Sequence, residues 1–235
     1  MDDEYQRYFE KRSVETTDDA NAVVPEYLKR VLPASHSRIL DIGCGTGRML
    51  SALTNAGFTR CQGVDIAKEA VAICQKKGLN VKLIDSIVSL VVGKKTNRFD
   101  LILMSHVLEH IAREKIIPTL RHIRKDLLKT AGRFVLMVPN AQSNTWCYWA
   151  FEDFTHRTLF TAGSLKFVLL SAGFESVEFL DPRCLLETRR FLRPVKSLPL
   201  KVYEMRTNFW NKVTSSSFHA PSERIYSFEI KASVR

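Results

Sequence analysis

Short apolar runs alternate along the chain with longer segments in which apolar residues recur every three or four positions. The helical periodicity predicts helices over 48–53, 67–77, 114–128 and 162–172. The apolar runs predict buried strands over 39–42, 62–66, 81–84, 99–104, 133–138, 174–180 and 225–232. Runs without polar interruption are typical of parallel strands that are covered on both faces. The alternation therefore predicts an α/β fold with a doubly wound, Rossmann-like sheet of seven strands, the last of them antiparallel.

The chain is expected to form one domain with four parts. Residues 1–37 would form an N-terminal helical cap, 38–181 the core, 182–222 a basic insertion and 223–235 the last strand. The cap is expected to hold helices near 5–9 and 25–32, which either cover the sheet edge or, for the first, fold over a bound cofactor. An insertion of this length before a last strand must have structure or a function of its own.

Composition limits the environment and the partners. Hydrophobic residues make up 45% of the 235 residues, enough for a sizeable core. The net charge of +10 suggests either an anionic partner, such as nucleic acid, a phosphorylated substrate or a membrane surface, or simply a solvated surface. Five cysteines without a C-x-x-C pair favour free thiols. The acidic start, Asp2 to Glu4, is unlike a signal peptide, and no apolar run reaches the roughly 18 residues of a spanning helix. We therefore expect a cytoplasmic location, with the inner face of the membrane as an alternative.

One stretch combines a strand, a glycine-rich turn and a helix. Residues 41–47 read DIGCGTG and follow the first apolar run. Glycines at every second position remove Cβ atoms where the chain turns, and the helix that follows directs free N–H groups at a ligand. This spacing differs from the G-x-G-x-x-G of nicotinamide-binding proteins, which makes a dehydrogenase less expected.

These motifs resemble those of class I S-adenosylmethionine (SAM)-dependent methyltransferases. DIGCGTG (41–47) resembles motif I of that family, and FDLI (99–102) followed by VLEHI (107–111) resembles motif IV. The block DFTHRTLFTAGSLKFVLLSAGF (153–174) is similar to one found in methyltransferases of quinone, antibiotic and surface-polysaccharide biosynthesis. The resemblance implies SAM as the cofactor and methyl transfer as the reaction.

The expected cofactor site lies at the carboxyl ends of the strands, where open α/β sheets bind ligands. Asp65, about 20 residues past the glycine turn, would accept both ribose hydroxyls, and the resemblance implies that Asp85 takes the adenine amino group. Either acid could instead cap a helix. The full expected set is Asp41, Gly43, Cys44, Gly45, Gly47, Asp65, Ile66, Asp85, Ser86, Ser105 and His106.

Methyl transfer to a hydroxyl requires a base, and histidine has a matching pKa. The candidates, His156, His110 and His106, lie in the expected site loops, although each could be structural. The string His106-x-x-Glu109-His110 also suggests a metal site, since some ubiquinone-type O-methyltransferases seem to place metal ligands in this turn. Those ligands include a carboxylate where this chain has His106, so no metal is expected. The sequence Ser105 to Leu108 replaces the Asn-Pro-Pro-Tyr type of loop, which disfavours methylation of DNA and of glutamine.

The sequence therefore predicts a SAM-dependent O-methyltransferase that acts on a hydroxyl of a glycan, a polysaccharide or a prenyl lipid. The alternatives are a tRNA or rRNA methyltransferase, suggested by the charge, and a non-catalytic subunit that keeps the fold for binding. In the segment 183–212, basic residues interleave with apolar ones. It could lie on an anionic membrane surface, grip RNA, or form a structural lid or dimer face, with nucleic acid the less expected partner. The oligomeric state is not predicted.

Overall fold

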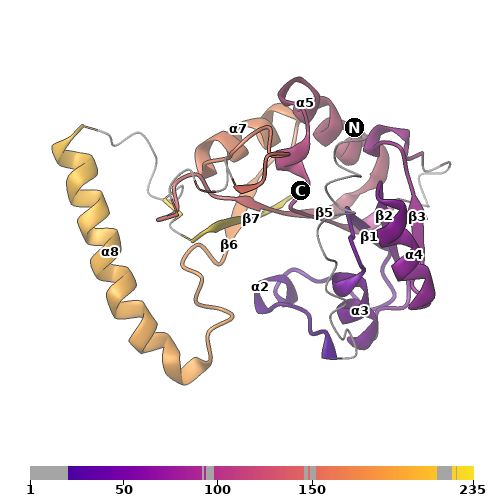
Figure 1. Cartoon of the computed structure of the whole chain (residues 1–235), viewed down its shortest axis with the longest axis horizontal. Helices are drawn as coiled ribbons and strands as arrows, with labels where there is room; N and C mark the ends of the chain where they lie inside the picture. Colours follow the sequence, from indigo (N-terminus) through magenta and orange to yellow (C-terminus); the bar gives the residue numbers. More distant parts are fainter. Residues whose placement is uncertain are drawn as a thin grey trace.

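The computed structural model describes residues 21–91, 93, 98–145, 148, 152–215, 224–225 and 227–235. In this part of the chain a seven-stranded sheet has the order β3-β2-β1-β4-β5-β7-β6 (Figure 1). β7 runs opposite to the other six strands. The predicted fold class, with its antiparallel last strand, is confirmed. The strands are β1 (Ile39–Ile42), β2 (Cys61–Asp65), β3 (Val81–Leu83), β4 (Phe99–Ser105), β5 (Leu128–Pro139), β6 (Val177–Leu180) and β7 (Glu229–Val234).

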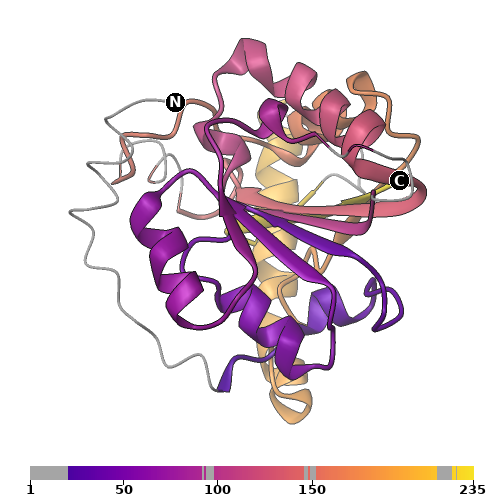
Figure 2. The same cartoon turned by 90° about the vertical axis from the view of Figure 1, so that its right-hand side faces the viewer.

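Helices cover both faces of the sheet (Figures 1 and 2). One face packs against α5 (Arg113–His122) and α7 (Ala162–Ser171), and the other against α2 (Glu26–Lys29) and α3 (Arg48–Asn55). α4 (Lys68–Lys76) packs beside β2 and β3. In β1, Leu40 and Ile42 join the first core and Ile39 the second. Burial on both faces explains why the parallel strands are apolar without interruption.

Two strands begin later than predicted, and both differences have a local cause. β6 starts at Val177 rather than at 174, because Gly173 and Phe174 donate backbone hydrogen bonds to Leu170 and Leu169 and so close the end of α7. β7 starts at Glu229 rather than at 225. The amide of the fully buried Asn140 donates to the carbonyl oxygens of residues 225 and 227 at 2.7 and 2.8 Å, which fixes this segment outside the ladder.

Other boundaries also differ from the prediction. The predicted helix 114–128 is α5 followed by a π-helical turn, η5 (Ile123–Leu127), which runs directly into β5. β5 therefore starts five residues before the predicted 133. α2 is shorter than the predicted 25–32, and the helix expected near 5–9 lies outside the described residues.

The insertion consists mainly of one long helix. A 3₁₀ turn, η6 (Arg190–Leu192), leads into α8 (Arg193–Val213), which lies beyond β6 at one side of the molecule (Figure 1). β6 ends and β7 begins at the carboxyl edge of the parallel strands, since Pro139 at the end of β5 pairs with Glu229. The insertion is therefore attached to the sheet at that edge by both its ends. Among the described residues, no helix combines the length and apolar character needed to cross a bilayer.

Candidate functional site

The glycine turn after β1 has a backbone that side chains would disturb. Gly43 and Gly45 have φ angles of +71° and +53°, in the left-handed region. A Cβ atom on Gly43 would lie 2.2 Å from Cγ2 of Val107, whereas one on Gly45 would meet no atom within 4 Å. The first glycine thus permits close packing of the loop after β4, and the second leaves bare backbone facing open space.

Asp65, at the end of β2, connects this turn to α4. Its Oδ2 accepts a hydrogen bond from Gly45 N at 2.8 Å and its Oδ1 one from Ala67 N at 2.9 Å. Burial raises the pKa of this carboxyl group, and the backbone donors oppose the rise. A carboxylate has about four acceptor positions, so Asp65 can hold the turn and still accept a ribose diol. The two roles considered from the sequence, a helix cap and a ribose ligand, are compatible.

A pocket opens beside the turn and encloses about 530 Å³ of empty space, part of which is open solvent. Its walls combine bare backbone, polar groups and branched aliphatic side chains, an arrangement typical of sites for small organic ligands. Six of the predicted site residues line it together: Gly43, Gly45, Asp65, Ile66, His106 and His110. The sequence analysis missed the remaining lining residues, which are Ile42, Val64, Ile84, Ile87 and Val107.

The other predicted cofactor residues lie around this pocket without lining it. Asp85 and Ser86 are exposed, between the lining residues Ile84 and Ile87. The thiol of Cys44 is buried in the cluster that packs α3 and α4 onto β3. Gly47 caps the start of α3 and Ser105 ends β4. Their roles in binding stay predictions.

Asp41 is a buried acid in β1, 4% exposed. Burial, and then the charge of Asp65, raise its pKa to about 7. Within the described part of the chain, no group donates a hydrogen bond to its carboxylate. A cation bound nearby would favour its ionised form.

His106 lies between two carboxylates, in a left-handed conformation (φ +54°) that is uncommon for histidine. Its Nδ1 is 3.2 Å from Oε1 of Glu109 and its Nε2 is 3.1 Å from Oε1 of Glu229. Burial alone would lower its pKa, but these two partners raise it to about 9. His106 is therefore an imidazolium at neutral pH, with no lone pair to accept a proton, which argues against it as the base.

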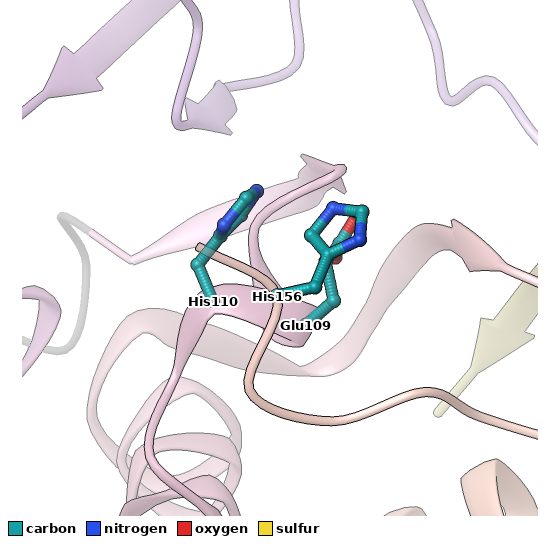
Figure 3. Close-up of side chains that lie close together, drawn as sticks. All are labelled: Glu109, His110 and His156. Carbon is teal, nitrogen blue, oxygen red and sulfur yellow. The ribbon is translucent and has the colours of Figure 1, made fainter. Parts of the chain in front are cut away.

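His110 and His156 lie side by side next to Glu109 (Figure 3). The ring centroids are 4.8 Å apart, and burial lowers the pKa of His110. The Oε2 atom of Glu109 is buried without a hydrogen-bond partner among the described residues. The Nε2 atom of His156 lies 4.0 Å from Oε1 of Glu109, beyond hydrogen-bond range. Ligand atoms of these three side chains lie within 4.8 Å of one another, so the cluster could hold a metal ion.

Thr155 determines the tautomer of His110. The Thr155 hydroxyl donates to Oδ1 of Asp153 at 2.5 Å. Although burial raises the pKa of Asp153, the hydrogen bonds from Thr155 hold it below its usual value, so the carboxylate is ionised and only accepts. The same hydroxyl lies 2.9 Å from Nδ1 of His110 and must accept there. His110 therefore carries its proton on Nδ1 and its lone pair on Nε2.

Comparison with known proteins identifies relatives of this chain and structures with a similar fold. A family model described as a methyltransferase domain matches residues 15–178. A ubiquinone biosynthesis O-methyltransferase of Xylella fastidiosa (strain 9a5c) is 28% identical over 182 residues, which cover 75% of this chain and 63% of that protein. The chain thus spans less than two thirds of the length of this relative.

Two solved structures share the fold. A SAM-dependent methyltransferase from Archaeoglobus fulgidus has a TM-score of 0.60 at 22% identity, covering 88% of this chain and 89% of that one. An S-adenosylmethionine-dependent methyltransferase from Mesorhizobium loti has a TM-score of 0.58 at 17% identity, covering 88% and 95%. These structures show the fold, and the match to the methyltransferase-domain family confirms the predicted cofactor, SAM.

We expect Asp65→Asn to weaken SAM binding roughly 10- to 100-fold, because an amide replaces a charged acceptor of the ribose hydroxyls. Titration calorimetry with SAM and with S-adenosylhomocysteine measures the change. Asp126→Asn, the same replacement at an exposed acid of η5, is the control and should leave binding unchanged. Wild-type affinity in Asp65→Asn would contradict the ribose role.

Asp41→Asn is expected to stabilise the ligand-free protein while weakening SAM binding. The unfolded carboxyl group ionises near its ordinary pKa of 3.8 and the folded one only near 7, so ionisation favours unfolding increasingly between these values. The variant should gain roughly 2–4 kcal/mol in free energy of unfolding above neutral pH and little in acid. Urea titrations at both pH values measure this. A loss of stability above neutral pH would contradict the unpaired buried charge.

Proposed function

Because the chain belongs to the methyltransferase-domain family and is SAM-dependent, we propose that it transfers a methyl group from SAM to a hydroxyl oxygen, with His110 as the general base. One observation carries the proposal. The neutral imidazole of His110 lines the same pocket as the glycine turn and Asp65. Thr155 holds the imidazole proton on Nδ1, which leaves the lone pair on Nε2. Methylation of a hydroxyl needs such a base beside the cofactor.

The atoms and charges of the step balance with residues present in the site. When bound, SAM would supply the methyl carbon, and its sulfur would keep the electron pair of the broken bond. As the acceptor oxygen bonds to that carbon, Nε2 of His110 takes the hydroxyl proton. The resulting imidazolium donates from Nδ1 to Thr155, whose hydroxyl is oriented by the Asp153 carboxylate. The neighbouring Glu109 carboxylate favours the same charge.

The remaining barrier is one of alignment. The acceptor oxygen must lie behind the methyl carbon, in line with the bond to sulfur, and holding it there removes much of the entropic cost. The backbone of the 153–158 loop is tied to the site, since Arg157 N and Thr158 N donate to the Glu109 carbonyl at 2.8 and 3.1 Å. His156 would then contact the acceptor beside His110, as a second proton acceptor or a positioning group.

The acceptor that we propose is a hydroxyl of a prenyl lipid. The Xylella fastidiosa relative is named as a ubiquinone biosynthesis O-methyltransferase, which supports this class over the glycan or polysaccharide that the sequence resemblance also suggested. A cytoplasmic location at the inner face of the membrane would suit such a substrate. An RNA acceptor and a non-catalytic binding role are outcomes of the first test.

That test is incubation of the protein with methyl-labelled SAM and fractions of a cell extract. We expect the label in the organic-solvent fraction, where it resists mild alkali as an ether does. Asp65→Asn, with weakened cofactor binding, should reduce the label in parallel. Label in the RNA fraction would replace the proposed acceptor. No label in any fraction, with SAM bound, would favour the binding role.

His110→Ala should lower kcat roughly 10²- to 10⁴-fold, the contribution of a positioned base. Since burial lowers the His110 pKa, the wild-type rate should be constant at neutral pH and fall only in acid, where Nε2 is protonated. His106→Ala and His156→Ala are measured beside it, each with SAM affinity determined separately. Normal turnover in His110→Ala would contradict its role as the base.

Thr155→Val separates orientation from simple loss of structure. It keeps the shape of the side chain and removes the hydroxyl that accepts from Nδ1. We expect a lower kcat and a change in the pH at which the rate falls in acid, whereas SAM affinity should be unchanged. A change confined to stability would indicate a purely structural role for Thr155.

A further inference from the structure

α8 has its apolar side turned outward. Large hydrophobic residues recur every three or four positions from η6 through α8, so that they share one side of the helix. Their side chains are 56–70% exposed, which is unusual for a contiguous apolar row. The row, called here the α8 stripe, consists of Phe191, Val195, Leu198, Val202, Met205, Phe209 and Val213.

The opposite side of α8 is polar and faces the rest of the insertion. Arg183 makes a two-point ion pair with Glu204, at 3.0 and 3.3 Å. Arg193 donates to the carbonyl oxygens of Leu186 and Thr188, at 2.9 and 3.1 Å. Polar contacts therefore hold the helix in place, and the α8 stripe contributes nothing to the described core.

Cations border the stripe on both sides. At about 100° per residue, Lys201 and Lys212 lie along one border and Arg206 along the other, and all three are exposed. Glu204 is the only acid between residues 190 and 213, and it is paired on the inner side. The outer face of α8 is thus apolar at its centre and positive at its edges.

We propose that α8 lies in the surface of an anionic phospholipid bilayer, with the α8 stripe among the acyl chains and the bordering cations at the headgroups. An interfacial helix has this arrangement, an apolar face with Phe or Trp and a Lys- and Arg-rich border. Trp210, 54% exposed, lies beside the stripe at the level that aromatic rings prefer in membranes. Over 21 residues the helix would offer about 31 Å of contact.

The charges disfavour the two other occupants. Two copies packed through this face would bring Lys201, Arg206 and Lys212 close to their like, with no exposed acid of α8 to pair with them. RNA is disfavoured because its phosphates bind cations, whereas the centre of the α8 stripe is apolar. An anionic lipid surface satisfies both the centre and the border.

Docking through α8 would also orient the pocket. The insertion leaves β6 and returns to β7 at the carboxyl edge of the sheet, and Glu229 at that return contacts the pocket residue His106. A bilayer under α8 would therefore lie on the side of the molecule where the insertion leaves and rejoins the carboxyl edge of the sheet. This inference concerns binding to lipid and holds whether or not the acceptor is a prenyl lipid.

The test is flotation of the full chain with vesicles of phosphatidylcholine, alone or mixed with phosphatidylglycerol. We expect binding to the mixed vesicles that weakens with added salt, because the Debye length shortens. Leu198→Glu with Phe209→Glu should abolish it. Lys201→Ala with Lys212→Ala should weaken it about 25-fold, since each cation near an anionic surface contributes roughly fivefold.

Phe167→Glu is the matched control, because Phe167 is a phenylalanine of similar exposure, 66%, on α7. It should bind vesicles like the wild type. Circular dichroism and SAM binding establish that each variant is folded. The proposal is overturned if folded wild type ignores anionic vesicles, if Phe167→Glu loses binding equally, or if light scattering shows a dimer that only the α8 stripe variant dissociates. A gel shift with RNA that persists where lipid binding is absent would point to RNA instead.

Discussion

The common direction of six strands determines where the pocket residues and the two ends of the insertion lie. Because β1, β2, β4 and β5 run parallel, their carboxyl ends meet at one edge, and each loop leaving that edge faces the same space. The glycine turn, Asp65 and the His106–His110 segment converge there although they are far apart in the sequence. β7 runs the other way and thereby starts at this edge, which brings Glu229 to His106. The strand direction thus places the pocket, its charged residues and both attachment points of the insertion at the same edge of the sheet.

The edge also concentrates buried charge, and the charges there have different tasks. Glu109 and Glu229 hold His106 as a cation, while burial keeps the adjacent His110 neutral. The two histidines are four residues apart, yet their surroundings push their pKa values in opposite directions. Such a separation of protonation states within one site is how a fixed cation and a proton acceptor coexist at neutral pH. The Asp41 carboxyl group accepts no hydrogen bond from the described residues, and its pKa is raised by burial and by Asp65, so a cationic cofactor nearby would favour its ionised form.

Much of this arrangement could be predicted from the sequence, and the limits have physical reasons. The strands β1 to β4 and the glycine turn are local patterns, so periodicity and glycine spacing were sufficient to predict them. Glu229 could not be predicted, because its contact with His106 spans 123 positions and depends on the register of β7. The tautomer of His110 depends on Thr155, whose hydroxyl is positioned by a turn that includes Asp153. The start of β7 was predicted too early because the Asn140 side chain donates hydrogen bonds to the carbonyl oxygens of residues 225 and 227, which the apolar pattern had assigned to the strand.

α8 shows that the same apolar periodicity can serve a purpose other than folding. Helices such as α5 and α7 use it to cover the sheet, with Ile116 and Leu120 of α5 and Leu165 and Leu169 of α7 buried in the core. In α8 the pattern is as regular, but the sheet faces are already covered by α2, α3, α5 and α7, and polar contacts turn the apolar side outward. A helix that stabilises its position with ion pairs and leaves its hydrophobic residues in solvent gains little from them in folding. In the proposed docking, their stabilising contribution comes from a surface that the described part of the chain does not supply, and the cations along the stripe favour a surface of negative charge.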